Sequence, residues 1–262
     1  MIAREIDDMK RVSGLLKVLG SVVGSRGDYV QEKKYLQEGL DIARQIGDRE
    51  QICAILINLG VTAGEHGDHV QAEAYFQEGL DIARQIGDRE LMSVLLSNLG
   101  EAAGAQGNYV QAEAYFQEGL GIARQIEHHE WISVLLSNLG LTLWKQGNII
   151  LAEECFQQGL ATARLIGRPQ ITANILYEYG NFCLEQQHIE KAEATFHEAL
   201  TTIREGDQDL IALARYGLAR VEAQKGHIQE ARKLGRVSLI SLETLGHRNA
   251  WQVKDWLASL EL

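Results

Sequence analysis

Residues 68–86 read DHVQAEAYFQEGLDIARQI and residues 108–126 read NYVQAEAYFQEGLGIARQI, so the two stretches differ at three of 19 positions. Residues 93–100 (SVLLSNLG) recur unchanged at residues 133–140. Both shifts are 40 residues. A constant period of this length is typical of repeat proteins, in which each repeat is one supersecondary unit that stacks on its neighbours.

Each period is predicted to form two helices. In residues 48–87, a first apolar stripe with spacings of three and four residues consists of Ile52, Ile55, Leu56, Leu59 and Ala63. A second stripe consists of Ala72, Phe76, Leu80 and Ala83. Between them, Gly67 can end the first helix in the left-handed conformation, and Asp68 can cap the second by accepting a backbone N–H. Because neither helix can bury its stripe alone, we expect neighbouring pairs to stack.

The repeat resembles the tetratricopeptide repeat, in a longer form of 40 residues. The Leu-Gly pair of that family's first helix is found as Leu59-Gly60, Leu99-Gly100 and Leu139-Gly140. Its small residue in the second helix is found as Ala72, Ala112, Ala152, Ala192 and Ala231. Its aromatic residue four positions later is found as Phe76, Phe116, Phe156 and Phe196. The departures from the pattern cluster in the first and last repeats.

The fold expected from this resemblance is all-α: a right-handed superhelical solenoid of about six antiparallel helix pairs with a C-terminal capping helix. We assign residues 1–262 to a single domain. Its repeats are expected at about 8–47, 48–87, 88–127, 128–167, 168–205 and 206–246, and its capping helix at 247–262. Residues 2–8 (IAREIDD) match the end of a second helix, residues 82–88 (IARQIGD), so residues 1–7 are a possible tail of a preceding repeat. The chain is then a fragment of a longer protein, or its first unit is degenerate.

Charge and composition exclude several classes of partner. The formal net charge is −11, without a basic stripe, which argues against nucleic acid and against an anionic membrane surface. There is no apolar run long enough to span a membrane, and residues 1–14 lack the apolar core of a secretory signal. Cys53, Cys155 and Cys183 have no metal-ligand spacing. We therefore expect a soluble, cytoplasmic protein without a cofactor or a metal.

The sequence contains no enzyme motif: it has no glycine-rich phosphate loop, no HExxH and no nucleophile elbow. His128 and His129 lie between two glutamates, which could suggest a metal site. They occupy the turn between repeats, however, and adjacent turn residues rarely converge on one ion. A non-catalytic protein is therefore expected.

The residues of interest lie on the first helix of each pair. By the resemblance, the side of that helix that does not stack lines the concave groove of the solenoid. Asn58, Asn98 and Asn138 recur there, and their amides could hold the backbone of an extended peptide. Alternatively, each Asn bonds the neighbouring repeat, or duplication copied it passively. Lysines of a carboxylate clamp are not expected, because Ala54, Val94 and Val134 stand one turn earlier.

The other side chains assigned to this surface become more aromatic toward the second half of the chain. They are Val94, Val134, Glu101, Leu141, Trp144, Lys145, Tyr177, Asn181, Tyr216 and Arg220. An exposed Trp144 would be the leading anchor, because aromatic residues are frequent binding hot spots. We refer to the three asparagines and these residues together as the first-helix face.

The predicted function is recognition of a protein or peptide segment in the concave groove. The 40-residue units resemble the sensor arrays of bacterial signal-transduction ATPases of the STAND type and of transcription regulators, which suggests a sensor or scaffold part of a larger regulatory protein. A first alternative is a self-assembly scaffold, because an array cut at its N-terminal side exposes an apolar stacking face. A second is a small-molecule sensor with a pocket among Trp144, Tyr177 and Tyr216.

Overall fold

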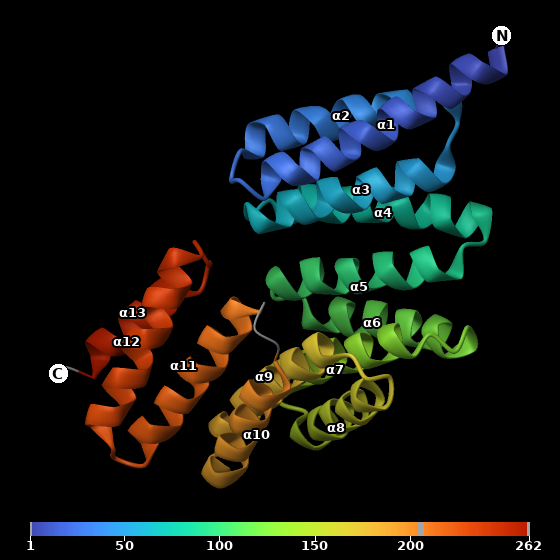
Figure 1. Cartoon of the computed structure of the whole chain (residues 1–262). Coiled ribbons are helices and arrows are strands. Elements are labelled where there is room, and N and C mark those ends of the chain that lie inside the picture. Colours follow the sequence, from blue (N-terminus) through green and yellow to red (C-terminus); the bar gives the residue numbers. More distant parts are fainter. Residues whose placement is uncertain (1, 204–206, 261–262) are drawn as a thin grey trace. The chain divides into compact units, whose positions relative to one another are not determined.

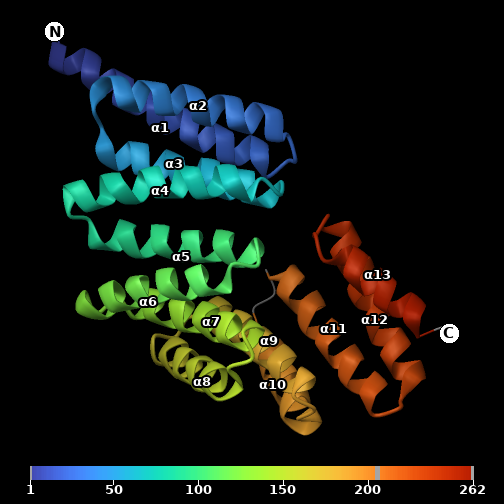
Figure 2. The same ribbon diagram turned by 180° about the vertical axis from the view of Figure 1, so that it is seen from behind.

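The computed structural model describes residues 2–203 and 207–260, which form thirteen α-helices and no strand (Figures 1 and 2). The all-α prediction is confirmed. The helices group into two compact units, the first ending at Trp131 and the second beginning at Ile132. The boundary predicted between residues 205 and 206 lies outside the described residues, as do residues 1, 261 and 262.

The first unit contains three helix pairs. Its helices are α1 (Ile2–Gly24), α2 (Tyr29–Ile46), α3 (Arg49–Glu65), α4 (His69–Ile86), α5 (Arg89–Ala105) and α6 (Tyr109–Gln125). Within each pair the two helices pack along their length, and the second helix of one pair also packs on the first helix of the next. Figure 1 shows the resulting stack of helices from α1 to α6.

The second unit continues the alternation. Its helices are α7 (His129–Lys145), α8 (Ile149–Leu165), α9 (Pro169–Glu185), α10 (Ile189–Thr202), α11 (Gln208–Gln224), α12 (Ile228–Thr244) and α13 (Ala250–Ser259). The first three residues of α7, which end at Trp131, belong to the first unit. Pro169 stands in the first turn of α9, where its missing N–H has no helical partner to lose.

Recurrent turns separate these helices. The side chains of Asp48 and Asp68 each accept the backbone N–H three residues later, at 3.1 Å, and thereby cap α3 and α4. Gly47 and Gly67 precede them with φ of 70° and 81°, the left-handed conformation that satisfies the last carbonyls of the preceding helix. The stop and start signals predicted from the sequence are thus confirmed in this repeat.

The Leu-Gly pairs are explained by the aromatic ring on the second helix. A Cβ atom on Gly60 would lie 2.3 Å from Cε1 of Phe76, so only glycine leaves room for the ring. Phe76 is 4% exposed and packs with Leu80 and Leu95 in one cluster. The ring therefore fills the space between its own pair and the next pair, as the repeat pattern predicts.

The two ends of the chain differ from the regular repeats. Residues 2–7 continue without a break into α1, since Asp7 stands where Gly47 ends α2, so these residues form no separate segment. That they derive from a preceding repeat stays a proposal. At the other end, Val253 of α13 is buried, and Trp256 and Leu257 pack in the same cluster. Trp251 of the same helix does not cover this edge, because its side chain is 67% exposed.

Candidate functional site

The asparagine ladder, which consists of Asn58, Asn98 and Asn138, begins in the first unit. Asn58 on α3 and Asn98 on α5 hold the same position, one turn before the end of the apolar stripe, and both are half-buried. The Asn58 amide donates to Oγ of Ser21 on α1 at 3.2 Å. This is the alternative in which the asparagine bonds the neighbouring repeat, and it holds for Asn58.

Asn98 has a different neighbour. The position that Ser21 holds in the first repeat is held by Val61 in the second, and a valine side chain offers no acceptor. Within the described part of the chain, the structure gives no hydrogen-bond partner for the Asn98 side chain. Glu101, one turn further along α5, is exposed. In this unit, Asn98 is therefore the amide that could serve a ligand.

In the second unit, the residue type at the ladder position changes after Asn138. Asn138 on α7 is half-buried and is engaged in an interaction of its own. The next position in the row, on α9, is Glu178. The asparagine ladder therefore ends at α7, and a different polar group takes its place on α9 and α11.

We name that group the α9–α11 cluster; it consists of Tyr177, Asn181, Tyr216 and Arg220. Nη1 of Arg220 donates to Oδ1 of Asn181 at 2.8 Å. The Arg220 guanidinium also lies over the Tyr216 ring, 5.7 Å from its centroid, at a distance typical of a cation–π contact. Asn181 and Tyr216 are buried, at 9% and 4% exposure, whereas Arg220 is half-buried. Two buried neighbours thus orient one partly accessible cation.

Burial shapes the ionisation of this region. It raises the pKa of the Tyr177 phenol to about 12, with a further contribution from the charge of Glu178. Burial also raises the pKa of Glu178, although its hydrogen bond with Asn181 and the charge of Lys145 act in the opposite direction. Tyr177 is consequently a neutral hydrogen-bonding group at any physiological pH.

The structure contradicts the expectation of an exposed Trp144. Its side chain is 8% exposed and meets Phe182 edge-on, with ring centroids 5.7 Å apart. Nζ of Lys145 lies 4.4 Å from the centre of the same ring. Gly64 and Gly104 hold this position in the two preceding repeats, so the ring has no counterpart there. Trp144 is a core residue and not an exposed anchor.

The remaining aromatic candidate on α11 is also largely packed away. Tyr216 meets Trp256 of α13 edge-on at 5.3 Å between centroids. Sequence reasoning placed Tyr216 and Asn181 on one surface, and the contact of both with Arg220 brings them together. Their contacts with Arg220 were not predicted, because these contacts depend on distances between repeats.

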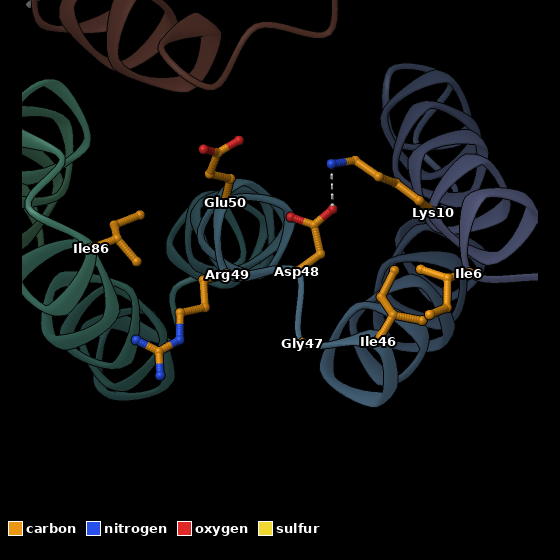
Figure 3. Close-up of a pocket in the computed structure, with 8 residues that line it drawn as sticks. All are labelled: Ile6, Lys10, Ile46, Gly47, Asp48, Arg49, Glu50 and Ile86. Carbon is orange, nitrogen blue, oxygen red and sulfur yellow. Dashed lines mark ion pairs between the residues drawn. The ribbon is translucent and has the colours of Figure 1, made fainter. Parts of the chain in front are cut away.

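A depression of about 430 Å³ lies in the first unit, between the start of α3 and neighbouring helices (Figure 3). Its lining consists of Ile6, Lys10, Ile46, Gly47, Asp48, Arg49, Glu50 and Ile86. Nζ of Lys10 reaches Asp48 Oδ2 at 2.9 Å across it, while Asp48 Oδ1 caps α3. Lys10 and Asp48 are thus already paired within the protein. We therefore interpret the depression as a packing feature between repeats and not as a binding site.

A ladder of ion pairs joins successive second helices. Arg44 pairs with Glu78, Arg84 with Glu118 at 2.8 Å, and Arg164 with Glu198. The partners are 34 residues apart in each case. The sequence analysis missed this ladder, although the constant spacing of Arg and Glu could have revealed it.

The described residues offer neither a metal site nor a membrane-spanning helix. Among the residues that the structure describes, no three His, Cys, Asp or Glu side chains converge in a way that could hold a metal ion. His128 serves the turn: its Nδ1 accepts the backbone N–H of Trp131 at 3.3 Å. None of the described helices is both long and apolar enough to cross a bilayer.

Comparison with known proteins identifies the repeat. A family model described as "Tetratricopeptide repeat" matches residues 12–85, 91–164 and 171–239, well over half of the chain. A search of curated proteins finds no match.

Several solved structures share the fold. The apo form of RapI is 16% identical, with a TM-score of 0.69, and the alignment covers 90% of this chain and 85% of that one. A STAND protein with a tetratricopeptide repeat sensor from Pyrococcus horikoshii is 18% identical, with a TM-score of 0.66. That alignment covers 93% of this chain but only 36% of the STAND protein. A Rap protein complexed with competence and sporulation factor is 17% identical, with a TM-score of 0.62, covering 92% and 65%. At these identities the likeness shows the fold alone.

Proposed function

Since the chain belongs to the tetratricopeptide repeat family, we propose that it is a binding module that holds an extended protein or peptide segment on its first-helix face. The single observation that carries the proposal is the 2.8 Å hydrogen bond by which Asn181 orients Arg220. A repeat protein of this kind is a protein-interaction module, and the proposal includes no catalytic step.

Arg220 supplies the principal contact in this proposal. A guanidinium has five N–H donors in a rigid fork, and Asn181 occupies one donor of Nη1. The Arg220 guanidinium also lies over the ring of Tyr216, which supports it on that side. The remaining donors suit a carbonyl or carboxylate oxygen of a bound segment, and the fork geometry favours two parallel bonds. Little side-chain entropy is lost on binding, because the cation is already oriented.

In the first unit, an amide on a first helix would hold the backbone of a bound segment. The Asn98 amide offers two donors and an acceptor, and the part of the chain described here gives it no partner. Asn58 contributes less in this proposal, since its amide is already bonded to Ser21. Each unit therefore has its own proposed contact: Asn98 with Glu101 in the first unit, and in the second unit Arg220 with Asn138, Lys145, Tyr177 and Asn181 as supporting positions.

The wider context proposed is a sensor or scaffold part of a larger regulatory protein. The similar STAND protein carries a tetratricopeptide repeat sensor, and this chain spans about a third of its length. The similar Rap protein was solved with competence and sporulation factor bound. Both likenesses support a role in recognition. The small-molecule alternative loses its basis, because Trp144 and Tyr216 are buried in aromatic packing.

Selection of displayed random peptides on the 262-residue chain tests the proposal. Binding of an enriched peptide is then measured by fluorescence anisotropy against wild type, Arg220→Ala, Asn98→Ala and the control Lys254→Ala, which changes an exposed side chain of α13. Arg220→Ala should weaken binding about tenfold or more, as expected for a charged hydrogen-bond partner, and Lys254→Ala should not change it. Equal affinity for all four proteins, or the absence of any enriched peptide, would contradict the proposal.

A further inference from the structure

The ladder position of the first helices holds a carboxylate in the second unit. Glu178 on α9 stands where α5 and α7 carry Asn98 and Asn138. Its side chain is half-buried and is hydrogen-bonded with Asn181. An ionised carboxylate accepts hydrogen bonds but donates none, so it cannot replace the amide of the ladder. The role of Glu178 must therefore differ from that of the asparagines.

Three cations lie near Glu178 in the second unit. The charges of Lys145 on α7 and of Arg248, in the turn between α12 and α13, both act on its carboxyl group. Arg220 on α11 donates to Asn181 at 2.8 Å, and Asn181 is also the hydrogen-bond partner of Glu178. Two phenols belong to the same group, those of Tyr177 and Tyr216. Helices α7, α9 and α11 and the turn before α13 thus bring their charges to one place.

The positive charges of this group exceed its negative charge. Among the described residues, neither Arg220 nor Arg248 forms an ion pair with a carboxylate. Nζ of Lys145 lies 4.4 Å from the centre of the Trp144 ring, which carries no charge. Three cations beside one carboxylate attract a negatively charged partner, although the chain as a whole has a net charge of −11. The group therefore suits an acidic side chain of a bound segment.

Glu178 opposes such a partner while it is ionised. Burial raises the pKa of its carboxyl group, and this effect exceeds the opposite effects of the Asn181 hydrogen bond and of the charges of Lys145 and Arg248. Glu178 therefore takes up a proton at a higher pH than an ordinary glutamate. A bound acidic side chain places a second negative charge beside it and raises this pKa further. Binding of the acidic side chain and protonation of Glu178 consequently favour each other.

We propose that the second unit binds an acidic residue of a protein segment through Arg220, Lys145 and Arg248, and that the charge of Glu178 regulates this binding. The ionised carboxylate repels the acidic residue, whereas the protonated carboxyl group does not. Affinity for an acidic segment therefore rises as the pH falls toward the range in which Glu178 is protonated. The inference rests on the proposed function, because it names the chemistry of the segment that the first-helix face holds and a condition that regulates its binding.

Fluorescence anisotropy with two labelled peptides of about ten residues tests the inference. One peptide alternates glycine with glutamate, and the other alternates glycine with glutamine. Affinities are measured between about pH 5.5 and about pH 8, where glutamates of the probe, with ordinary pKa values near about 4.3, stay ionised. Glu178→Gln keeps the shape of the side chain without its charge. It should bind the glutamate probe about tenfold more tightly than wild type at about pH 8, a difference that should shrink toward about pH 5.5. The control Glu185→Gln, at an exposed position of α9, should behave as wild type does.

The outcomes separate this inference from the proposed function. Glu178→Gln should bind the glutamate probe at least about tenfold more tightly than the glutamine probe, and Arg248→Ala should weaken binding of the glutamate probe about threefold or more. Titration of a histidine such as His247 is common to wild type and Glu178→Gln and cancels in their comparison. Equal binding of both probes, binding of neither, or equal affinities of wild type and Glu178→Gln at about pH 8 overturns the inference. Display-enriched peptides whose binding depends on Arg220 would then still support the proposed function, and their absence would contradict both.

Discussion

A Cβ atom placed on Gly100 would lie 2.4 Å from Cε1 of Phe116, closer than two such atoms approach in proteins. The same relationship links Gly60 to Phe76 and Gly180 to Phe196. The glycine of the first helix and the ring of the second helix therefore form one packing unit in these three repeats.

Gly100→Ala is expected to destabilise the fold by about 1–3 kcal/mol, because the ring must move to admit the methyl group. Gly104, one turn further along α5, provides a matched control. A Cβ atom there would lie 3.9 Å from Cβ of Ala112, an ordinary contact. Gly104→Ala should be neutral or stabilising by up to about 1 kcal/mol, since alanine favours the helix. Urea denaturation of both variants decides; a loss as large at Gly104 as at Gly100 would contradict the packing explanation.

Phe116→Ala should cost about 3–5 kcal/mol of unfolding free energy, the range for truncating a buried aromatic side chain. Phe116 is 2% exposed and packs against Gly100 of its own helix pair. Val110→Ala, at a position 77% exposed, should change stability by less than about 0.5 kcal/mol. Denaturant titration measures both. A loss below about 1 kcal/mol for Phe116→Ala would mean that the repeat register is wrong.

Asn58→Ala and Asn98→Ala should differ although both replace the same residue at the same repeat position. Asn58→Ala removes the hydrogen bond to Ser21 and should cost about 0.5–1.5 kcal/mol. Asn98→Ala should change the melting temperature little, because the structure gives its amide no partner in the described residues. Calorimetry on the two variants tests this difference. A large loss of stability at Asn98 would assign that amide a structural role and remove it from the binding proposal.

Glu153 should make stability depend on pH in the acid range. Its carboxylate accepts hydrogen bonds from Lys191 and from Tyr179, and the bond with Lys191 is the main cause that lowers the pKa of Glu153. A carboxyl group whose pKa is lowered in the folded state stabilises the fold above its unfolded pKa of about 4.3, and this contribution is lost as the pH falls through the folded pKa.

Glu153→Gln should therefore be less stable than wild type at neutral pH, and the difference should shrink as the solution is acidified below about pH 4. Denaturation midpoints measured across this range provide the test, with Glu154→Gln on the same helix as the control. A stability difference that is constant with pH would show that the carboxylate is not the stabilising group.

Local features were predictable from the sequence because they repeat. Gly67 and Asp68 mark the end of one helix and the start of the next through the conformation and hydrogen bonding of the residues themselves, so the helix boundaries follow from them. The pairing of glycine with phenylalanine also follows, since both recur in step. The division into two units had no comparable signal in the sequence.

Contacts between repeats were harder to predict. Trp144 is buried because Phe182, 38 positions later, lies against it, and no periodicity within one repeat indicates that contact. The first asparagine of the ladder bonds Ser21, because the first repeat has a serine at the position where the second has Val61. Such features arise where the repeats diverge, so the regular pattern that identifies the fold carries no information about them.

Binding of an extended segment on the first-helix face can be measured by hydrogen–deuterium exchange of the chain, with and without a peptide enriched by display. The peptide should slow exchange in α9 and α11 around Asn181 and Arg220, and Arg220→Ala should remove this protection. Protection confined to the second helices α10 and α12, or unchanged in Arg220→Ala, would contradict it.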